Sequence, residues 1–253
     1  MCHHSSHGRR VGFTQIELLV VVSLMGVLAS MLVVGAQKAR EAARRIECTN
    51  QLRQLGVASH NYHETVGLFP SEVPANGGGQ GPSLYVSLLD YVELTSVRVS
   101  GDYINVGVKL YLCPSRRNSQ NAPGKRDFVY VQQAAGSGYA VFETPGGADM
   151  ASITTANGTA YTALLSHMWL TPTQWVNGSS NDDWYRAPNS VQSAMAVPDQ
   201  DPTGSGGLGS PHHVAMPTLF GDGHVQTLPY TWMSNQANQG IWNWSNSTHI
   251  DLP

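Results

Sequence analysis

Charge is scarce in this sequence and unevenly distributed. Only 12% of the 253 residues are Asp, Glu, Lys or Arg, and of the 14 Lys and Arg residues only Arg186 follows Arg126. Nine acids lie from Asp127 onward. Because phosphate binding needs a basic surface, we expect no DNA or RNA partner. The distal acids are expected to form a solvated face.

Signatures of enzymes and metal sites are also lacking. The sequence has no G-x-S-x-G motif, no Cys-His signature of a nucleophile, and no glycine-rich phosphate loop. It has no H-E-x-x-H motif and no tight group of zinc ligands. We therefore expect no enzymatic activity, no metal site and no cofactor. The acidic loop 198–204 lacks a complete calcium-loop pattern, and calcium binding there stays open.

One long segment is almost free of charge. From Phe13 to Ala36 the only ionisable side chain is Glu17. A run of roughly 20 apolar residues is long enough to cross a bilayer as a helix. Arg9 and Arg10 precede the run, so the positive-inside rule predicts a cytoplasmic N-terminus and an exported remainder. A carboxylate inside hydrocarbon is costly, so Glu17 is expected to have a partner.

The helix is expected to continue beyond the apolar run. Residues 37–62 contain no proline and place apolar side chains at helical spacing. These positions are Ile46, Leu52, Leu55, and Ala58 or Ser59. Gly67 and Pro70 predict the end of the helix. We therefore predict one helix over 13–65, about 50 residues or roughly 75 Å long, with a membrane span at about 13–36.

The remaining residues, 66–253, are expected to form one β-rich globular head, which makes the fold class α+β. Short apolar strings, such as Ser83–Leu89 and Asp127–Val131, alternate with Gly, Pro, Ser and Asn, a pattern that indicates short strands and long loops. Asp222-Gly223 lies between two extended runs. This is a strong hairpin signal, and it predicts positive φ at both turn residues.

The start of the apolar run carries a motif, G-F-T-Q-I-E-L-L at residues 12–19, behind the basic leader 1–12. This segment resembles the class III signal of type IV prepilins and pseudopilins. The resemblance implies that prepilin peptidase cuts between Gly12 and Phe13 and N-methylates Phe13. Glu17 would then pair with the α-amino group of Phe13 on a neighbouring subunit, because buried charges persist when paired. The alternative is a plain signal anchor.

Further segments extend the resemblance over most of the chain. They are AREAARR at 39–45, CTNQLRQLG at 48–56, HNYH at 60–63, LCPS at 112–115, and His212 followed after nine residues by Asp222-Gly223. These pieces resemble a large bacterial family of prepilin-like proteins with a C-terminal H-x9-DG motif and a domain of unknown function. This chain has Ser166 and His167 near the place where that family has an acid.

The H-x9-DG motif has structural explanations of its own. Asp222-Gly223 is accounted for by a turn, and His212 by polar packing or helix capping. A catalytic role for His212 and Asp222 remains a third and more distant hypothesis.

Two cysteines remain if the leader is removed with Cys2, namely Cys48 and Cys113. An exported protein permits a disulfide between them. Such a bridge would close a loop of about 65 residues and contribute about 3 to 4 kcal/mol in the chain-entropy model. Two buried free thiols are the alternative.

These observations predict a structural subunit like a type IV pilin or a type II secretion pseudopilin. The protein would be a single-pass protein of a bacterial inner membrane, with a cytoplasmic N-terminus and a periplasmic or extracellular head. Its expected partners are prepilin peptidase, other pilin or pseudopilin subunits and membrane lipid. The alternative is a membrane-anchored binding module that does not polymerise and holds a glycan or a cation with its acidic, Trp-containing head.

Overall fold

The computed structural model describes residues 12–76, 80–132, 138–178, 181–202, 204, 206–213, 215–245 and 250–253. Of the predicted leader, only Gly12 falls within these residues. The chain forms two compact units, residues 1–43 and residues 44–253. The second unit is the globular head, and it includes the C-terminal part of the long helix.

The long N-terminal helix, α1 (Gln15–Val66), has 52 residues and ends just before Gly67, as predicted. All side chains from 12 to 40 are exposed. Within the head the helix buries one face, made of Cys48, Gln51, Leu52, Leu55, Gly56, Ala58 and Ser59. Ile46, which is also on the predicted and observed helix, is not part of this face, because its side chain is 63% exposed.

The head contains a five-stranded sheet in the order β3-β1-β2-β6-β7. Its strands are β1 (Phe128–Val131), β2 (Ala163–His167), β3 (Ser190–Val191), β6 (Ala215–Phe220) and β7 (Val225–Pro229). The β1–β3 pair is parallel, and the other neighbouring pairs are antiparallel. A second sheet pairs β4 (Ala196–Pro198) with β5 (Leu208–Ser210) in parallel. The predicted α+β class is confirmed.

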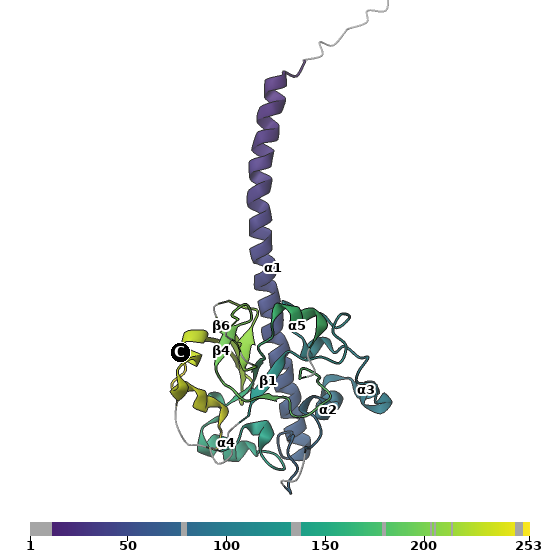
Figure 1. Cartoon of the computed structure of the whole chain (residues 1–253), viewed down its shortest axis with the longest axis vertical. Helices are drawn as coiled ribbons and strands as arrows, with labels where there is room; N and C mark the ends of the chain where they lie inside the picture. The colour runs from purple at the N-terminus through teal and green to yellow at the C-terminus, as the bar shows by residue number, and fades with distance from the viewer. Residues whose placement is uncertain are drawn as a thin grey trace, which may run out of the picture. The chain divides into compact units, whose positions relative to one another are not determined.

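Short helices fill the connections between these strands. They are α2 (Leu84–Ser87), η1 (Leu89–Val92), α3 (Thr95–Ser100), η2 (Lys109–Tyr111), η3 (Val141–Glu143), α4 (Met150–Ala156), η4 (Thr159–Tyr161), α5 (Pro172–Asn177), α6 (Tyr230–Met233) and η5 (Gln236–Trp242). Figure 1 shows the labelled strands beside the part of α1 that belongs to the head.

The sheet packs directly on α1. Every residue of β1 and β2 is buried, which is typical of strands covered on both faces. A Cβ atom at Gly56 would lie 2.9 Å from Cδ1 of Leu219 on β6, so the missing side chain lets the helix approach this strand. Close packing of this kind makes the head sensitive to changes on the buried face of α1.

The predicted strand at Ser83–Leu89 is wrong. This string forms α2 and the start of η1, and it buries Leu84, Tyr85, Leu88 and Leu89. Counted from Leu84, the other three buried residues lie one, four and five positions further along the chain. This is the spacing of one face of a helix and not the alternation of a strand. The other string, around Phe128–Val131, is strand β1 as predicted.

The predicted hairpin at Asp222-Gly223 is confirmed, but its turn differs from the expected one. The register of β6 and β7 pairs Leu219 with Val225. Gly223 has φ 86°, whereas Asp222 does not have a positive φ. The Phe220 N–H donates to the His224 carbonyl at 2.9 Å, which leaves a three-residue loop. Such loops need glycine at one left-handed position only.

Truncation of Leu55, which is fully buried on α1, should destabilise the head. We expect Leu55→Ala to lower the free energy of unfolding by about 2 to 5 kcal/mol, because the change leaves a cavity in a close-packed core. Val57→Ala is the matched control, since Val57 is 59% exposed on the same helix. Denaturant titration of the two full-length variants in detergent measures the difference. Equal effects of both changes would contradict the packing described here.

Candidate functional site

The N-terminus of α1 is organised by Thr14 and Glu17. The Thr14 N–H and hydroxyl donate to the Glu17 carboxylate at 2.8 Å and 2.7 Å, and the Glu17 N–H donates to the Thr14 hydroxyl at 3.4 Å. This reciprocal pattern is a capping box, in which Glu or Gln occupies the third helical position. Glu17 therefore has a local structural role that the sequence analysis did not identify.

The predicted cleavage position lies in an accessible part of this segment. Gly12 and Phe13 precede the first helical residue, and the Phe13 side chain is 73% exposed. Within the described residues, α1 is the one helix that is long and apolar enough to cross a membrane, judged by length and composition. The chain thus has one long apolar N-terminal helix that is consistent with a single membrane span.

The two halves of the H-x9-DG motif take part in different contacts. Asp222 lies in the β6–β7 turn, where its Oδ1 accepts a hydrogen bond from the His224 N–H at 3.0 Å. His212 is 1% exposed, and its ring packs edge-on against the ring of His167 at a centroid distance of 5.8 Å. His212 therefore belongs to the interior of the head, while Asp222 shapes an exposed turn.

Four buried side chains converge in the head and form the Cys2His2 cluster, defined as Cys48, Cys113, His167 and His212. One ligand atom from each lies within 4.8 Å of the ligand atoms of the other three. Cys48 Sγ is 2.9 Å from His167 Nε2. The prediction that the chain has no tight group of zinc ligands is wrong, because residues far apart in the sequence meet here.

The members of the cluster come from four different parts of the head. Cys48 lies on α1, Cys113 follows η2, His167 ends β2, and His212 follows β5. Both cysteines are free and buried, so the structure contains the two-thiol alternative and not the candidate disulfide. His167 and His212 were not predicted to lie near either cysteine.

The surroundings favour charge on one sulfur. Burial by itself raises the pKa of the Cys113 thiol, but hydrogen bonds with Cys48, His167 and His212 outweigh this effect and hold the pKa well below its usual value. Burial and the contact with Cys113 raise the pKa of the Cys48 thiol. Burial lowers the pKa of His167, so its imidazole is neutral at neutral pH. The Cys113 sulfur, whose pKa is lowered, thus lies beside the neutral imidazole of His167.

The exposure of the four side chains to solvent determines whether they can react with a substrate. Cys48, Cys113 and His167 are 0% exposed, and His212 is 1% exposed. A catalytic thiolate has to reach a substrate, and reactive cysteines are partly exposed. The arrangement is therefore suited to holding a small ion and not to attacking a substrate.

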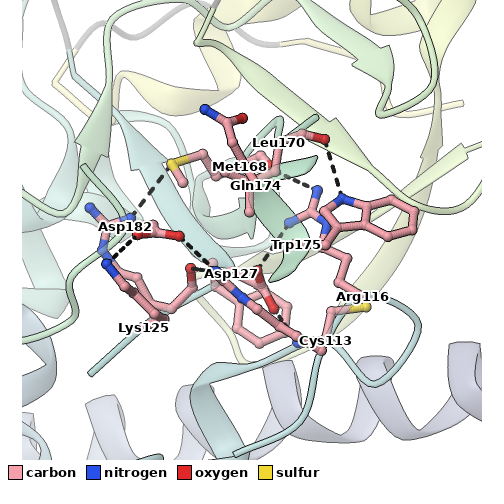
Figure 2. Close-up of polar contacts among 12 residues, drawn as sticks. Cys113, Arg116, Lys125, Asp127, Met168, Leu170, Gln174, Trp175 and Asp182 are labelled. Atoms are coloured by element: carbon pink, nitrogen blue, oxygen red, sulfur yellow. Dashed lines mark hydrogen bonds and ion pairs between the residues drawn. The ribbon is translucent and has the colours of Figure 1, made fainter. Parts of the chain in front are cut away.

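A buried network of ion pairs adjoins the cluster. The Cys113 N–H donates to Asp127 Oδ2 at 2.7 Å, and Arg116 pairs with Asp127 at 3.4 Å and with Asp199 at 2.7 Å. Figure 2 shows Cys113 and Arg116 next to Asp127, with Lys125 beside Asp182. Burial by itself lowers the pKa of Arg116, but the two carboxylates outweigh it and keep the guanidinium charged.

The prediction that the distal acids form a solvated face is wrong for several of them. Asp127, Asp182 and Asp199 are buried, and each pairs with a buried arginine. Arg117 pairs with Asp182 at 2.7 Å and with Asp127 at 2.9 Å. Asp199 is the first acid of the loop 198–204, which was considered for calcium binding. Its carboxylate forms an ion pair with Arg116.

A cleft of about 750 Å³ in the head is lined in part by Met168, whose carbonyl accepts a hydrogen bond from Arg116. Its lining includes Trp169, Gln174, Asp183, Arg186 and Gln192. This volume falls in the range of small-molecule sites, which is roughly 300–1,000 Å³. The three C-terminal tryptophans, at positions 232, 242 and 244, pack in or against the hydrophobic core.

Removing one charge from the buried network should be strongly destabilising. We expect Asp199→Asn to lower the free energy of unfolding by about 3 to 5 kcal/mol, because Arg116 would be left buried without its principal partner. Asp102→Asn, the same chemical change at an exposed position, is the control and should have little effect. Thermal or denaturant unfolding of both variants measures the difference, and similar losses for the two would refute the assignment.

Comparison with known protein families gives a match to one part of the chain. Residues 37–97 match the model of a family described as "Protein of unknown function (DUF1559)", a family typical of pilin-like proteins. Searches of curated proteins and of solved structures found no match. The matched residues cover the C-terminal part of α1 and continue into α3, so they include Cys48 but none of the other three members of the cluster. This part of the chain is similar to that family.

Proposed function

We propose that the protein is a membrane-anchored, pilin-like structural subunit that assembles through its N-terminal helix. In this proposal prepilin peptidase cuts between Gly12 and Phe13 and methylates the new terminus. The helix then lies in a bacterial inner membrane with its N-terminus cytoplasmic, and the head is periplasmic or extracellular. The protein acts by contacts with other pilin or pseudopilin subunits, as in type II secretion, and performs no catalysis.

The observation that carries this proposal is the apolar part of α1. From Phe13 to Ala36 it contains one ionisable side chain, and its side chains are exposed throughout. An apolar surface of this extent is not stable in water and requires lipid or neighbouring helices. The match to a family typical of pilin-like proteins supports the same conclusion.

Glu17 supplies the specific contact in this proposal. Its capping hydrogen bonds come from Thr14, but they leave the carboxylate charge unneutralised. The apolar segment from Phe13 to Ala36 contains no Lys, Arg or His. Cleavage after Gly12 would create one cation there, the α-amino group of Phe13. Pairing of this group with Glu17 between subunits would offset the cost of charges in hydrocarbon and set the register of the helices.

The capping box allows the charge of Glu17 to be tested apart from its capping role. Glu17→Gln keeps a side chain that can cap the helix but removes the charge. We expect at least about a ten-fold loss of self-association, corresponding to about 1.4 kcal/mol. Self-association in native membranes is measured by cross-linking and by recovery of sheared filaments.

Thr14→Val serves as the control, since it weakens the cap and retains the Glu17 charge. This variant should assemble like the wild type. If Glu17→Gln assembles normally while Thr14→Val does not, Glu17 acts as a helix cap and the proposed pairing is wrong.

The cleft lined by Trp169 and Gln174 favours a second candidate function, that of an anchored binding module. A cavity with an aromatic side chain and several polar groups suits a glycan or another small polar ligand. The binding-module function would be favoured if two results are found. The wild-type chain would not self-associate in its membrane, and it would bind a small ligand saturably, with the binding abolished by Trp169→Ala.

A further inference from the structure

The Cys2His2 cluster brings together the donor set of a zinc site. Thiolate sulfur and imidazole nitrogen are the ligands that structural zinc uses, and two of each is a common combination. The four donor atoms lie within 4.8 Å of one another. They come from four separate elements of the head, so their convergence is produced by the tertiary fold and not by a local sequence motif.

The spacing of the donors is close to that of a tetrahedral site. With Zn–S bonds of about 2.3 Å and Zn–N bonds of about 2.0 Å, the donors of a tetrahedral site are roughly 3.3 to 3.8 Å apart. The Cys48 Sγ to His167 Nε2 distance of 2.9 Å is shorter than this range, and the upper bound of 4.8 Å is longer. Adjustments of under about 1 Å would therefore seat an ion at the centre.

Charge balance favours a divalent ion. The adjoining network contains four cations, Arg116, Arg117, Lys125 and Arg186, paired with four anions, Asp127, Asp182, Asp183 and Asp199. It therefore leaves no net charge to compensate the cluster. Two thiolates, two neutral imidazoles and one Zn²⁺ also sum to zero, whereas a monovalent or trivalent ion would leave a net charge in a dry interior.

The enclosure of the cluster favours a structural role. All four side chains are at most 1% exposed. A catalytic zinc site keeps an open position for water or substrate, while a structural site has four protein ligands and no open position.

We propose that the Cys2His2 cluster binds one Zn²⁺ ion as a closed structural site. The ion would join α1 to β2 and to the segments that follow η2 and β5. It would also hold Cys48 and Cys113 as thiolate ligands and so protect them from oxidation to a disulfide in an exported head. This inference does not depend on filament assembly, since metal content is measured on the isolated chain.

The test starts with the full-length protein, purified in detergent without metal-affinity steps or chelators. Elemental analysis is expected to find about one zinc per chain. Cys113→Ser and His212→Gln should each lower the zinc content at least five-fold. His60→Gln, which changes a histidine outside the cluster, should leave it unchanged. Replacement of zinc by Co²⁺ should give the visible absorption bands of tetrahedral cobalt with thiolate ligands.

Chelation of the wild-type protein provides a readout that remains valid if the variants fold poorly. Removal of zinc should lower the Tm by about 5–10 °C, and added Zn²⁺ should restore it. A wild-type chain that contains no zinc, takes up neither Zn²⁺ nor Co²⁺, and shows no change in Tm with Zn²⁺ would overturn the proposal. Mass spectrometry that finds a Cys48–Cys113 disulfide in the mature protein would also overturn it.

Discussion

The buried face of α1 between Cys48 and Ser59 is the element on which the head is built. Strands β1 and β2 are buried at every position, so they need cover on both faces, and α1 supplies part of that cover. Contact at Gly56 brings the helix close to Leu219 on β6, and contact at Cys48 brings it to His167 on β2. One continuous helix thus provides an apolar segment at its start and a core element at its end.

The interior of the head combines this packing with buried charge. Arg116, Arg117 and Arg126 are almost fully buried in a chain that has few charges. Arg126 donates to neutral acceptors, including the carbonyl of Asn181 at 3.1 Å, whereas the other two arginines pair with carboxylates. Such networks tolerate few alternative arrangements, because any unpaired member would be left charged in a medium of low dielectric constant. The segment that carries Cys113 is positioned by this network.

The features that could be predicted from the sequence are those determined by residues close to one another along the chain. The absence of proline, the helical spacing and the Gly67 stop define α1, and Asp222-Gly223 defines a hairpin. The string at Ser83–Leu89 was misassigned because a short apolar run fits either a strand or a helix.

The interior sites depend on contacts that no local pattern reports. Cys48 and His167 are separated by 119 positions, and they meet only after the sheet has packed on the helix. The sequence resemblance drew attention to Ser166 and His167, but nothing in the sequence connected either residue to a cysteine. Likewise, the sequence around Arg116 and Arg117 has the pattern of an ordinary charged loop. Only the fold brings Asp127, Asp182 and Asp199 beside these arginines.

The intact mass and N-terminal sequence of the protein recovered from its native membrane test its processing as a pilin-like subunit most directly. A methylated Phe13 at the terminus is the predicted result, since it would show that prepilin peptidase accepts this leader and that the α-amino group needed by Glu17 is formed. An intact Met1, or a cut beyond Ala36, would contradict the pilin-like account and leave an anchored or released head in its place.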